Sequence, residues 1–435
     1  MNNWLYANYQ TLRDKKIKEI IVPGTHDSGA YVFNYEYTDS MHNKNNLFKN
    51  ISKIPFFGKW FINRWGLCQD KNIYEQLNSG IRLLDFRIYY DSINNNYRLA
   101  HRFPSENIED VINQINNFLN ENPNEFILII FKVDEDNKKS LTNVNKDNFW
   151  NIFSNNNLQN KIYRDEYNRN YTNITYSDLI NQGKNIIIID KNMRDPYNTE
   201  SFDYYYSQSY TTSAYKNIST ALDHSQNWKS KINSKRYNIL NTNITPDILN
   251  IVLDILNIIF TIIIIIFMQY YLYHYCGTSK ILKVIFINII ILVFYLLFYF
   301  IFNITIGKIS TVIVILLISI YAFKNRCISE DNLKNPLFDL KDEAPQNVLP
   351  TESSSNKVPY ILFFMMSILI LFNIYYNIHF NDFQGLYYKE PGYQNKFIEE
   401  LEDSCDKTQS CNISCVLFDF PTEDNIQKII QLNNI

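Results

Sequence analysis

The chain has 435 residues, of which 41 are basic and 44 acidic, so its formal net charge at pH 7 is only −3. This length allows two or three domains and a sizeable core. The small net charge and the lack of a basic stripe with interleaved aromatics exclude nucleic acid from the expected partners. Of the 6 cysteines, those at 405, 411 and 415 show no metal-ligand spacing and allow either one disulfide or free thiols.

Residues 1–247 alternate short apolar segments with amphipathic ones, a pattern typical of a β/α fold with parallel strands. A helix is expected around Asp110–Leu119, where apolar residues recur at helical spacing. The predicted strands are Glu19–Gly24, Ile81–Tyr89, Arg98–His101, Phe126–Val133, Asn185–Asp190 and Tyr237–Ile244.

Residues 248–380 are dominated by long aliphatic and aromatic runs of about 18–22 residues, the length that crosses a bilayer core. We expect four transmembrane helices, at about 253–273, 283–303, 305–323 and 360–380, with a polar loop at 325–358.

The soluble pattern resumes after this block. A helix around Lys396–Glu402, a strand at Ile413–Phe420 and a closing helix at Asp424–Leu432 are expected in residues 385–435. One strand and two helices cannot bury a core of their own, so they need the first block as a partner. The fold class is therefore predicted as α/β, a discontinuous TIM-type barrel interrupted by an all-α transmembrane insertion. An even number of spans would keep both parts of the barrel on one side of the membrane.

Four of the predicted strands end in polar side chains that a purely structural strand would avoid. In a parallel barrel, the active site lies at the carboxyl ends of the strands. These side chains should therefore gather at one mouth of the barrel. They are His26 and Asp27, Asp85 and Arg87, His101, and Lys132.

Together these segments resemble the catalytic X domain of phosphatidylinositol-specific phospholipase C. The resemblance covers residues 1 to about 247 and about 385–435. It is carried by PGTHDSG (Pro23–Gly29), GIRLLDFRIYYD (Gly80–Asp91), LAH (Leu99–His101), PNEFILIIFK (Pro123–Lys132), RYNILNTNITP (Arg236–Pro246) and VLFDFPTEDNIQKIIQLN (Val416–Asn433).

The resemblance implies a metal-independent mechanism with two histidines. His26 would be the general base that takes the proton from the inositol 2-hydroxyl, with Asp419 holding its ring. His101, paired with Asp27, would protonate the leaving diacylglycerol oxygen. This division is chemically reasonable, because two imidazoles with pKa values near neutrality can exchange acid and base roles.

Arg87 would neutralise the phosphate, with Asp85 supporting it, and Lys132 would bind the sugar. A carboxylate stands at the position of Arg87 in calcium-dependent relatives, and a fixed cation there repels Ca²⁺, so no metal and no cofactor is expected. Arg102 replaces the glycine usual after the second histidine and is a possible second phosphate contact. Tyr205, within Tyr204–Tyr206, is a candidate for stacking under the inositol, with Trp228 as an alternative.

The predicted activity is cleavage of phosphatidylinositol-type lipids at a bilayer, giving diacylglycerol and cyclic inositol phosphate. One alternative is a catalytically weak phosphoinositide-binding membrane tether or sensor, which Arg102 favours. The other is a glycerophosphodiester phosphodiesterase, which would need a metal-binding Glu-x-Asp where this chain has Asp85-Phe86-Arg87.

The expected localisation is that of a multi-pass integral membrane protein, and the side that the barrel faces stays open. The basic residues Lys280, Lys283, Lys324 and Arg326 on the loops opposite the barrel favour a barrel outside the cytosol. A long amino-terminal block without the apolar core of a signal peptide favours a cytosolic barrel.

Overall fold

The structure is a computed structural model. It describes residues 1–35, 50–55, 57–133, 141–155, 158–164, 173–190, 192–193, 204–206, 210–211, 232, 234–242, 244–245, 391–408 and 412–435. The chain forms two compact units, Met1–Asp247 together with Gly385–Ile435, and Ile248–Gln384. All of the described residues belong to the first unit, which contains both ends of the chain.

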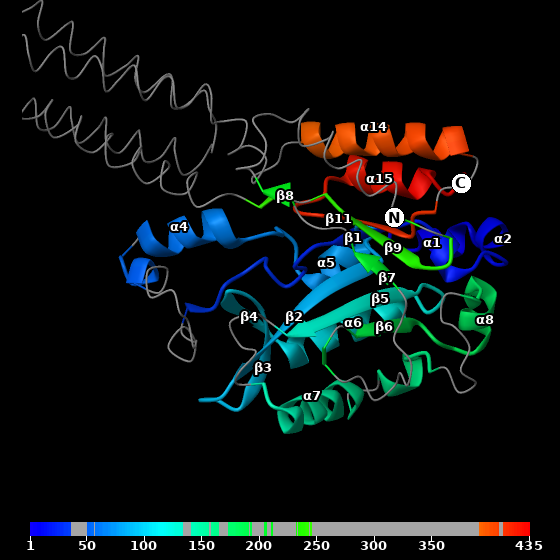
Figure 1. Cartoon of the computed structure of the whole chain (residues 1–435). Coiled ribbons are helices and arrows are strands. Elements are labelled where there is room, and N and C mark those ends of the chain that lie inside the picture. Colours follow the sequence, from blue (N-terminus) through cyan, green and yellow to red (C-terminus); the bar gives the residue numbers. More distant parts are fainter. Residues whose placement is uncertain are drawn as a thin grey trace, which may run out of the picture. The chain divides into compact units, whose positions relative to one another are not determined.

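A nine-stranded sheet organises this part of the chain (Figure 1). Its parallel strands are β1 (Val22–Thr25), β2 (Leu83–Asp91), β5 (Ile127–Val133), β6 (Ile186–Asp190), β7 (Tyr204–Tyr206), β9 (Tyr237–Asn241) and β11 (Cys415–Phe418). Each pairs with the next in chain order, apart from β6 and β7, for which the described residues show no pairing. The last strand, β11, returns to β1. This is the strand order of a TIM-type barrel, which confirms the predicted α/β class.

The strand predicted at Arg98–His101 does not belong to the parallel set. It forms β3 (Asn96–His101), which runs antiparallel to β2 and pairs in turn with β4 (Phe103–Asn107). The carboxylate of Asp91 accepts hydrogen bonds from the backbone N–H groups of Ile93 and Asn94, at 3.0 and 3.3 Å, and Asn95 adopts φ of 51°. This tight turn sends the chain back towards the mouth of the barrel. His101 therefore reaches the site at the end of a hairpin.

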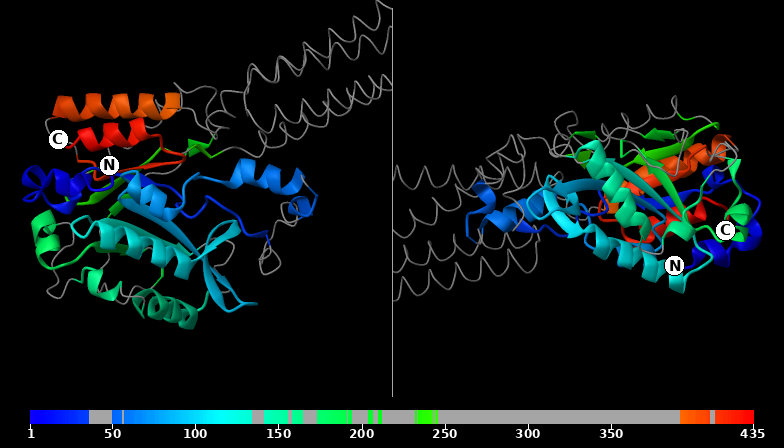
Figure 2. Two further views of the ribbon diagram at one scale, coloured as in Figure 1. Left: turned by 180° about the vertical axis from the view of Figure 1, so that it is seen from behind. Right: turned by 90° about the horizontal axis from the view of Figure 1, so that it is seen from below.

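Helices cover the outside of the barrel. The described helices are α1 (Trp4–Ala7), α2 (Tyr9–Leu12), α4 (Phe57–Gly66), α5 (Ile73–Asn78), α6 (Ile108–Glu121), α7 (Asn143–Asn155), α8 (Tyr176–Asn181), α14 (Pro391–Thr408) and α15 (Glu423–Gln431). Short 3₁₀ turns lie at Ile17–Glu19 and Gln159–Lys161. A separate two-stranded sheet consists of β8 (Tyr210–Thr211) and β10 (Ile244–Thr245). Helix α14 lies beside α15, and both lie on the opposite side of the barrel from α7 (Figures 1 and 2).

Helix α6 shows why these segments become helical. The Asn107 side chain accepts a hydrogen bond from the N–H of Glu109 and caps the first turn. Val111, Ile112 and Ile115 follow at helical spacing and are fully buried. The helix predicted from this periodicity is confirmed and extends a few residues further at each end.

Glycine at position 24 lets β1 and β11 pack closely inside the barrel. A Cβ atom there would lie 2.6 Å from Cδ2 of Leu417 and 2.9 Å from Sγ of Cys415, closer than real carbon contacts allow. The register places Gly24 opposite Leu417 and Thr25 opposite Phe418. The carboxyl ends of the first and last strands therefore lie side by side, and the residues that follow them emerge together.

The opposite end of the barrel is closed by polar contacts between distant segments. The side chain of Asn433 exchanges two hydrogen bonds of 2.8 Å with the backbone of Ile21, which joins the carboxyl terminus to β1. The Arg82 guanidinium forms a fully buried ion pair with Glu125, and Glu125 also accepts a 2.8 Å hydrogen bond from the N–H of Tyr6. This end is structural and lies away from the polar strand ends.

The predicted membrane localisation requires correction. Among the described residues, none of the helices combines the length and the apolar character that a bilayer crossing demands. Helix α14 reaches 18 residues but is rich in charge. The four expected spans and the polar loop, residues 248–380, lie outside the described part of the chain. The prediction of a multi-pass integral membrane protein is therefore wrong on this finding, and the all-α transmembrane insertion is not supported.

Candidate active site

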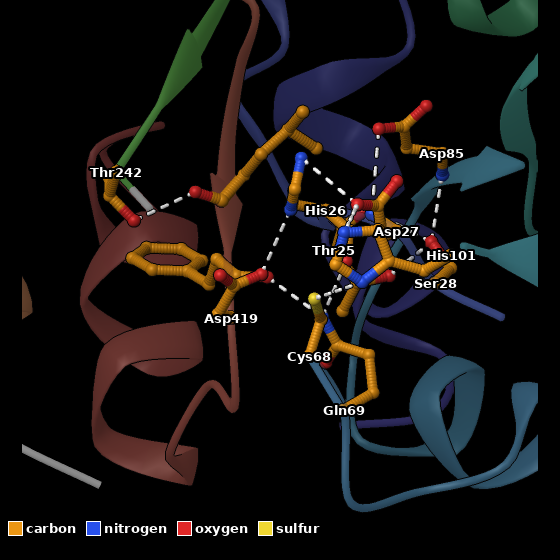
Figure 3. A network of polar contacts seen from close by, with 12 residues as sticks. Thr25, His26, Asp27, Ser28, Cys68, Gln69, Asp85, His101, Thr242 and Asp419 are labelled. Atoms are coloured by element: carbon orange, nitrogen blue, oxygen red, sulfur yellow. Dashed lines mark hydrogen bonds and ion pairs between the residues drawn. The ribbon is translucent and has the colours of Figure 1, made fainter. Parts of the chain in front are cut away.

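The first and last parallel strands each end in a residue of the candidate site. His26 follows β1, and its backbone N–H donates a 2.9 Å hydrogen bond to the carbonyl of Phe418, the last residue of β11. Asp419 comes next, and its Oδ1 lies 3.0 Å from Nδ1 of His26 (Figure 3). Both side chains are mostly buried, with 8% of His26 and 14% of Asp419 exposed. The contact expected between these two residues, 393 positions apart, is present.

Gln69 joins the same two strand ends from a third segment. Its Nε2 donates to the carbonyl of His26 at 2.8 Å and to that of Phe418 at 3.0 Å (Figure 3). The neighbouring Cys68 accepts a 2.9 Å hydrogen bond on its carbonyl from the N–H of Phe420. The loop before α5 therefore holds His26 and Asp419 at a fixed separation. No motif around Cys68 and Gln69 indicated this role.

Asp27 occupies the centre of the charged groups. Its side chain is fully buried, and its φ of 42° lies in the left-handed region, which aspartate tolerates better than most residues. One carboxylate oxygen contacts Nε of Arg87. The other lies 3.4 Å from Nε2 of His26 and 3.5 Å from Nε2 of His101. Among the described residues these oxygens have no further hydrogen-bond partner, so the carboxylate is stabilised mainly by the neighbouring charges.

The turn that carries Asp27 is fastened to β2. The N–H of Ser28 donates to the carbonyl of Asp85 at 2.9 Å, and Oγ of Ser28 accepts from the N–H of Asp85 at 2.7 Å. Thr25 and Ser28 also share a hydrogen bond of 2.7 Å between their hydroxyl groups. These bonds explain why the turn needs hydroxyl residues on both sides of His26 and Asp27.

His101 is oriented by helix α4 and by Cys68. Its Nδ1 lies 2.8 Å from the carbonyl of Gly66, which can only accept, so Nδ1 carries the hydrogen. Nε2 is then the atom that gains or loses a proton, and it faces Asp27. The Cys68 thiol lies 3.6 Å from the same Nδ1 atom.

Asp85 and Lys132 form a separate ion pair beside this cluster. Nζ of Lys132 lies 2.7 Å from Oδ2 of Asp85, whose side chain is fully buried. Asp85 was expected to support Arg87, but the ion pairs in the structure join Asp85 to Lys132 and Arg87 to Asp27. The reason is geometric, since Arg87 stands two residues further along β2 and reaches the turn above the strand end.

The charges shift the pKa values of the first histidine and its partners. Burial by itself lowers the pKa of His26, but the carboxylates of Asp27 and Asp419 outweigh burial and leave this pKa above its usual value. Burial raises the pKa of Asp419 more than His26 lowers it. Burial would also raise the pKa of Asp27, but the Arg87 guanidinium and the two histidines hold it well below its usual range.

The second histidine shifts in the opposite direction. Burial lowers the pKa of His101 to about 4, and Arg87 adds to this effect, while Asp27 opposes it. Burial also raises the pKa of the Cys68 thiol well above its usual value, helped by the nearby carboxylates. At neutral pH, His101 is therefore neutral and Cys68 is a thiol.

The remaining predicted site residues lie at the edge of the cluster or beyond the described side chains. Arg102 is exposed, with φ of 61°, a conformation that glycine adopts readily. This explains why a glycine is usual at this position in the resembling family. Tyr205 lies in β7, whose side chains are outside the described set, as is Trp228.

Three sets of described side chains offer three metal-ligating atoms within 4.8 Å of one another: His26, Cys68 and Asp419; Asp27, Cys68 and His101; and His26, Asp27 and Asp85. In the third set both carboxylates already carry a cation, because Arg87 pairs with Asp27 and Lys132 with Asp85. A surface hollow of about 770 Å³ beside the β3–β4 hairpin is lined by none of the predicted site residues.

The geometry defines an α/β barrel with two histidine–carboxylate pairs and an arginine at the carboxyl ends of its strands. Such an arrangement can accept a proton at one imidazole, release one at the other, and stabilise an anion between them.

The comparisons with known proteins agree with this class. The family model described as PI-PLC X 1 matches residues 48–257. A PI-PLC X-box domain-containing protein of Dictyostelium discoideum is 29% identical over 142 residues, 31% of this chain and 17% of the relative. PI-PLC X domain-containing protein 1 of Homo sapiens is 26% identical over 131 residues, 29% of this chain and 40% of the relative. The matched region therefore spans less than half of either relative.

Among solved structures, the phosphatidylinositol-specific phospholipase C from Listeria monocytogenes covers 56% of this chain and 80% of its own length, with 18% identity and a TM-score of 0.40. The family model and the relatives are X-domain proteins, so part of this chain is similar to the family that its sequence motifs resemble. His26 and Asp419 lie outside the matched residues 48–257, so their place in the site comes from the structure.

Proposed function

We propose that this protein is a phosphodiesterase that cleaves phosphatidylinositol-type lipids without a metal ion, giving diacylglycerol and cyclic inositol phosphate. The single observation that carries the proposal is the contact between His26 and Asp419, since it completes a histidine–carboxylate pair from the two ends of the chain. The second pair, His101 with Asp27, lies beside the first pair, because the buried carboxylate of Asp27 faces both His26 and His101.

In the first step, His26 acts as the general base. Its Nδ1–H donates to Asp419, which leaves the Nε2 lone pair to take the proton of the inositol 2-hydroxyl. The freed oxygen attacks phosphorus, and the bond between phosphorus and the diacylglycerol oxygen breaks. Because its carboxylate partners raise the pKa of His26, the imidazolium that forms in this step is stabilised.

In the second step, His101 protonates the diacylglycerol oxygen through Nε2. Gly66 holds the ring by its Nδ1–H, and Asp27 stabilises the protonated form. His101 has a pKa of about 4 before substrate binds, so it must gain its proton with the substrate. A phosphodiester anion brings a negative charge to the site and raises the pKa of a neighbouring imidazole.

The positive side chains provide the contacts to the anionic substrate. Arg87 is 20% exposed and already lies 3.3 Å from Nε2 of His26, so its guanidinium is placed to stabilise charge on the phosphoryl oxygens. Lys132, with its ammonium held by Asp85, is proposed to bind the sugar. Arg102, which is exposed next to His101, is proposed to contact the phosphate, and Tyr205 is proposed to stack under the inositol ring.

A direct test is to incubate the purified protein with phosphatidylinositol in detergent micelles, in the presence of a chelator, and to follow products by ³¹P NMR. The proposal predicts cyclic inositol phosphate with the chelator present, and a strong loss of its formation in His26→Ala. A reaction that occurs only when Ca²⁺ is added back would contradict the metal-independent mechanism.

A second candidate function is binding of inositol phospholipids without efficient cleavage. It is favoured by the lowered pKa of His101, which leaves the proposed acid neutral at pH 7, and by the unusual Arg102. This candidate predicts saturable binding of inositol phospholipid vesicles and no phosphorus-containing product in the same NMR assay. The glycerophosphodiesterase alternative is disfavoured, because Arg87 and Lys132 pair with the carboxylates that a metal would need.

A further inference from the structure

The thiol of Cys68 lies between the two histidine–carboxylate pairs, and the proposed reaction does not use it. The residue is 1% exposed, and Sγ is 3.6 Å from Nδ1 of His101 (Figure 3). The same sulfur lies within 4.8 Å of ligating atoms of both His26 and Asp419. Cys68 thus completes a set of thiol, imidazole and carboxylate with either pair.

This combination of groups matches the ligand preference of zinc. Zn²⁺ binds cysteine sulfur at about 2.3 Å and histidine nitrogen or carboxylate oxygen at about 2.0–2.2 Å, in a tetrahedron that water can complete. Nδ1 of His26 and Oδ1 of Asp419 are already 3.0 Å apart. The three groups therefore need only small side-chain movements to meet one ion, and the 14% exposed Asp419 provides a path to solvent.

The two possible ligand sets differ in their surroundings. Asp27 is in contact with the Arg87 guanidinium, whose charge opposes a second cation on the same carboxylate. The ion pair shown for Asp419 is with His26 alone, and that contact is made through Nδ1, on the side of the ring away from Arg87.

We propose that Cys68, His26 and Asp419 form a binding site for Zn²⁺ or another soft divalent cation, and that this ion inhibits the protein. Binding displaces the thiol proton to solvent and takes the Nδ1 lone pair of His26. The ring hydrogen then moves to Nε2, the atom that the proposed mechanism needs as a proton acceptor. The inhibition rests on the proposed function, whereas the binding of the ion does not.

The binding is tested with Cd²⁺, whose bond to a thiolate gives an ultraviolet charge-transfer absorbance. The full chain, reduced with a phosphine, is titrated with CdCl₂ as wild type and as Cys68→Ala, Asp419→Asn and Cys415→Ala. Cys415 is the matched control, a free and buried cysteine in β11. We expect Cys68→Ala and Asp419→Asn to weaken the tightest binding at least about tenfold, since even outer-shell changes cost that much. Cys415→Ala should not weaken it.

Equal absorbance and affinity in wild type and Cys68→Ala would overturn the site. A loss in Cys68→Ala without a loss in Asp419→Asn would move the ion to His101 and Asp27 and overturn the ligand set. Circular dichroism of each variant shows whether it is folded, and the two variants remove different ligands, so a folding defect in one leaves the other to decide.

The inhibition is tested by adding Zn²⁺ to the phosphatidylinositol assay without chelator. The wild type should lose activity, and Cys68→Ala should need at least about tenfold more Zn²⁺ for half inhibition, each relative to its own metal-free rate. Activation by Zn²⁺ would contradict the inference. If no lipid is cleaved under any condition, the proposed function fails, while the Cd²⁺ titration still decides whether the ion binds.

Discussion

Replacing Asp419 by asparagine removes the charge that holds His26 while keeping the shape of the side chain. The bond between Nδ1 and Oδ1 is 3.0 Å long, and both side chains are at least 86% buried, so solvent screening of the pair is weak. A hydrogen bond to a charged group contributes about 1.5–3 kcal/mol. Without Asp419, the transition state that forms the His26 imidazolium loses this stabilisation. The value of kcat/KM should therefore fall roughly 10- to 150-fold.

The same substitution should change the pH dependence. Asp419 raises the pKa of His26 both by its charge and by its hydrogen bond, so Asp419→Asn must lower this pKa. His26 is the group with the higher pKa of the two histidines, and it therefore sets the upper limb of the pH profile of kcat/KM. That limb should move to lower pH in Asp419→Asn, and the lower limb, set by His101, should stay in place.

The assay is steady-state cleavage of phosphatidylinositol micelles between pH 4 and 9 with chelator present. Asp424→Asn is the matched control, because Asp424 lies in the first turn of α15, is 63% exposed and pairs only with Lys428 in the contacts shown. Its activity should stay within about twofold of the wild type, as expected for a surface pair. An Asp419→Asn variant with the rate and the pH profile of the wild type would refute the role assigned to the pair.

Three further predictions follow from other contacts. Arg87→Lys should lower kcat roughly 100-fold in the same cleavage assay, because a lysine ammonium cannot contact Asp27 and the phosphoryl oxygens together; unchanged kcat would exclude the guanidinium role. The ring of His101 should titrate by NMR with a pKa of about 4, and an ordinary histidine pKa would contradict its burial. Between about pH 4 and the ordinary histidine pKa, His101 is neutral in the folded protein but protonated in the unfolded chain. The free energy of unfolding should therefore rise with pH in this window, and His101→Gln should flatten the rise. Glu125→Gln should lower the free energy of unfolding by about 3–5 kcal/mol in urea, because it leaves the buried Arg82 charge without its partner; a loss below about 1 kcal/mol would show that the pair is dispensable.

The parallel strands could be predicted because their local and global signals agree. β5 (Ile127–Val133) is an almost unbroken apolar run, which a parallel strand buried on both faces requires. The polar residues His26 and Asp27, which follow the apolar run Ile20–Val22, marked the end of β1. The polar residues at such strand ends could then be grouped without coordinates.

Features that depend on a third segment could not be predicted. Cys68 and Gln69 belong to no motif, and their contacts arise only when the loop before α5 packs against the ends of β1 and β11. The pairing of Asp85 with Lys132 depends on the stagger between β2 and β5. The strand that carries His101 was expected in the parallel set but runs antiparallel to β2, because a segment as short as Arg98–His101 carries no signal of its direction.

The apolar runs in residues 248–380 led to the wrong localisation. Hydropathy alone indicated helices of bilayer length, yet the helices in the described part of the chain give no span, and the runs themselves lie outside it. Every described site residue belongs to the unit formed by Met1–Asp247 and Gly385–Ile435.

The central claim is that residues from the two ends of the chain act as one catalytic pair. A double-mutant cycle of His26→Ala and Asp419→Asn, measured as kcat/KM on phosphatidylinositol with chelator present, tests it most directly. Because Asp419 acts through His26, the double variant should be no less active than His26→Ala alone. Losses that multiply in the double variant would show that the two residues act independently and would contradict the account.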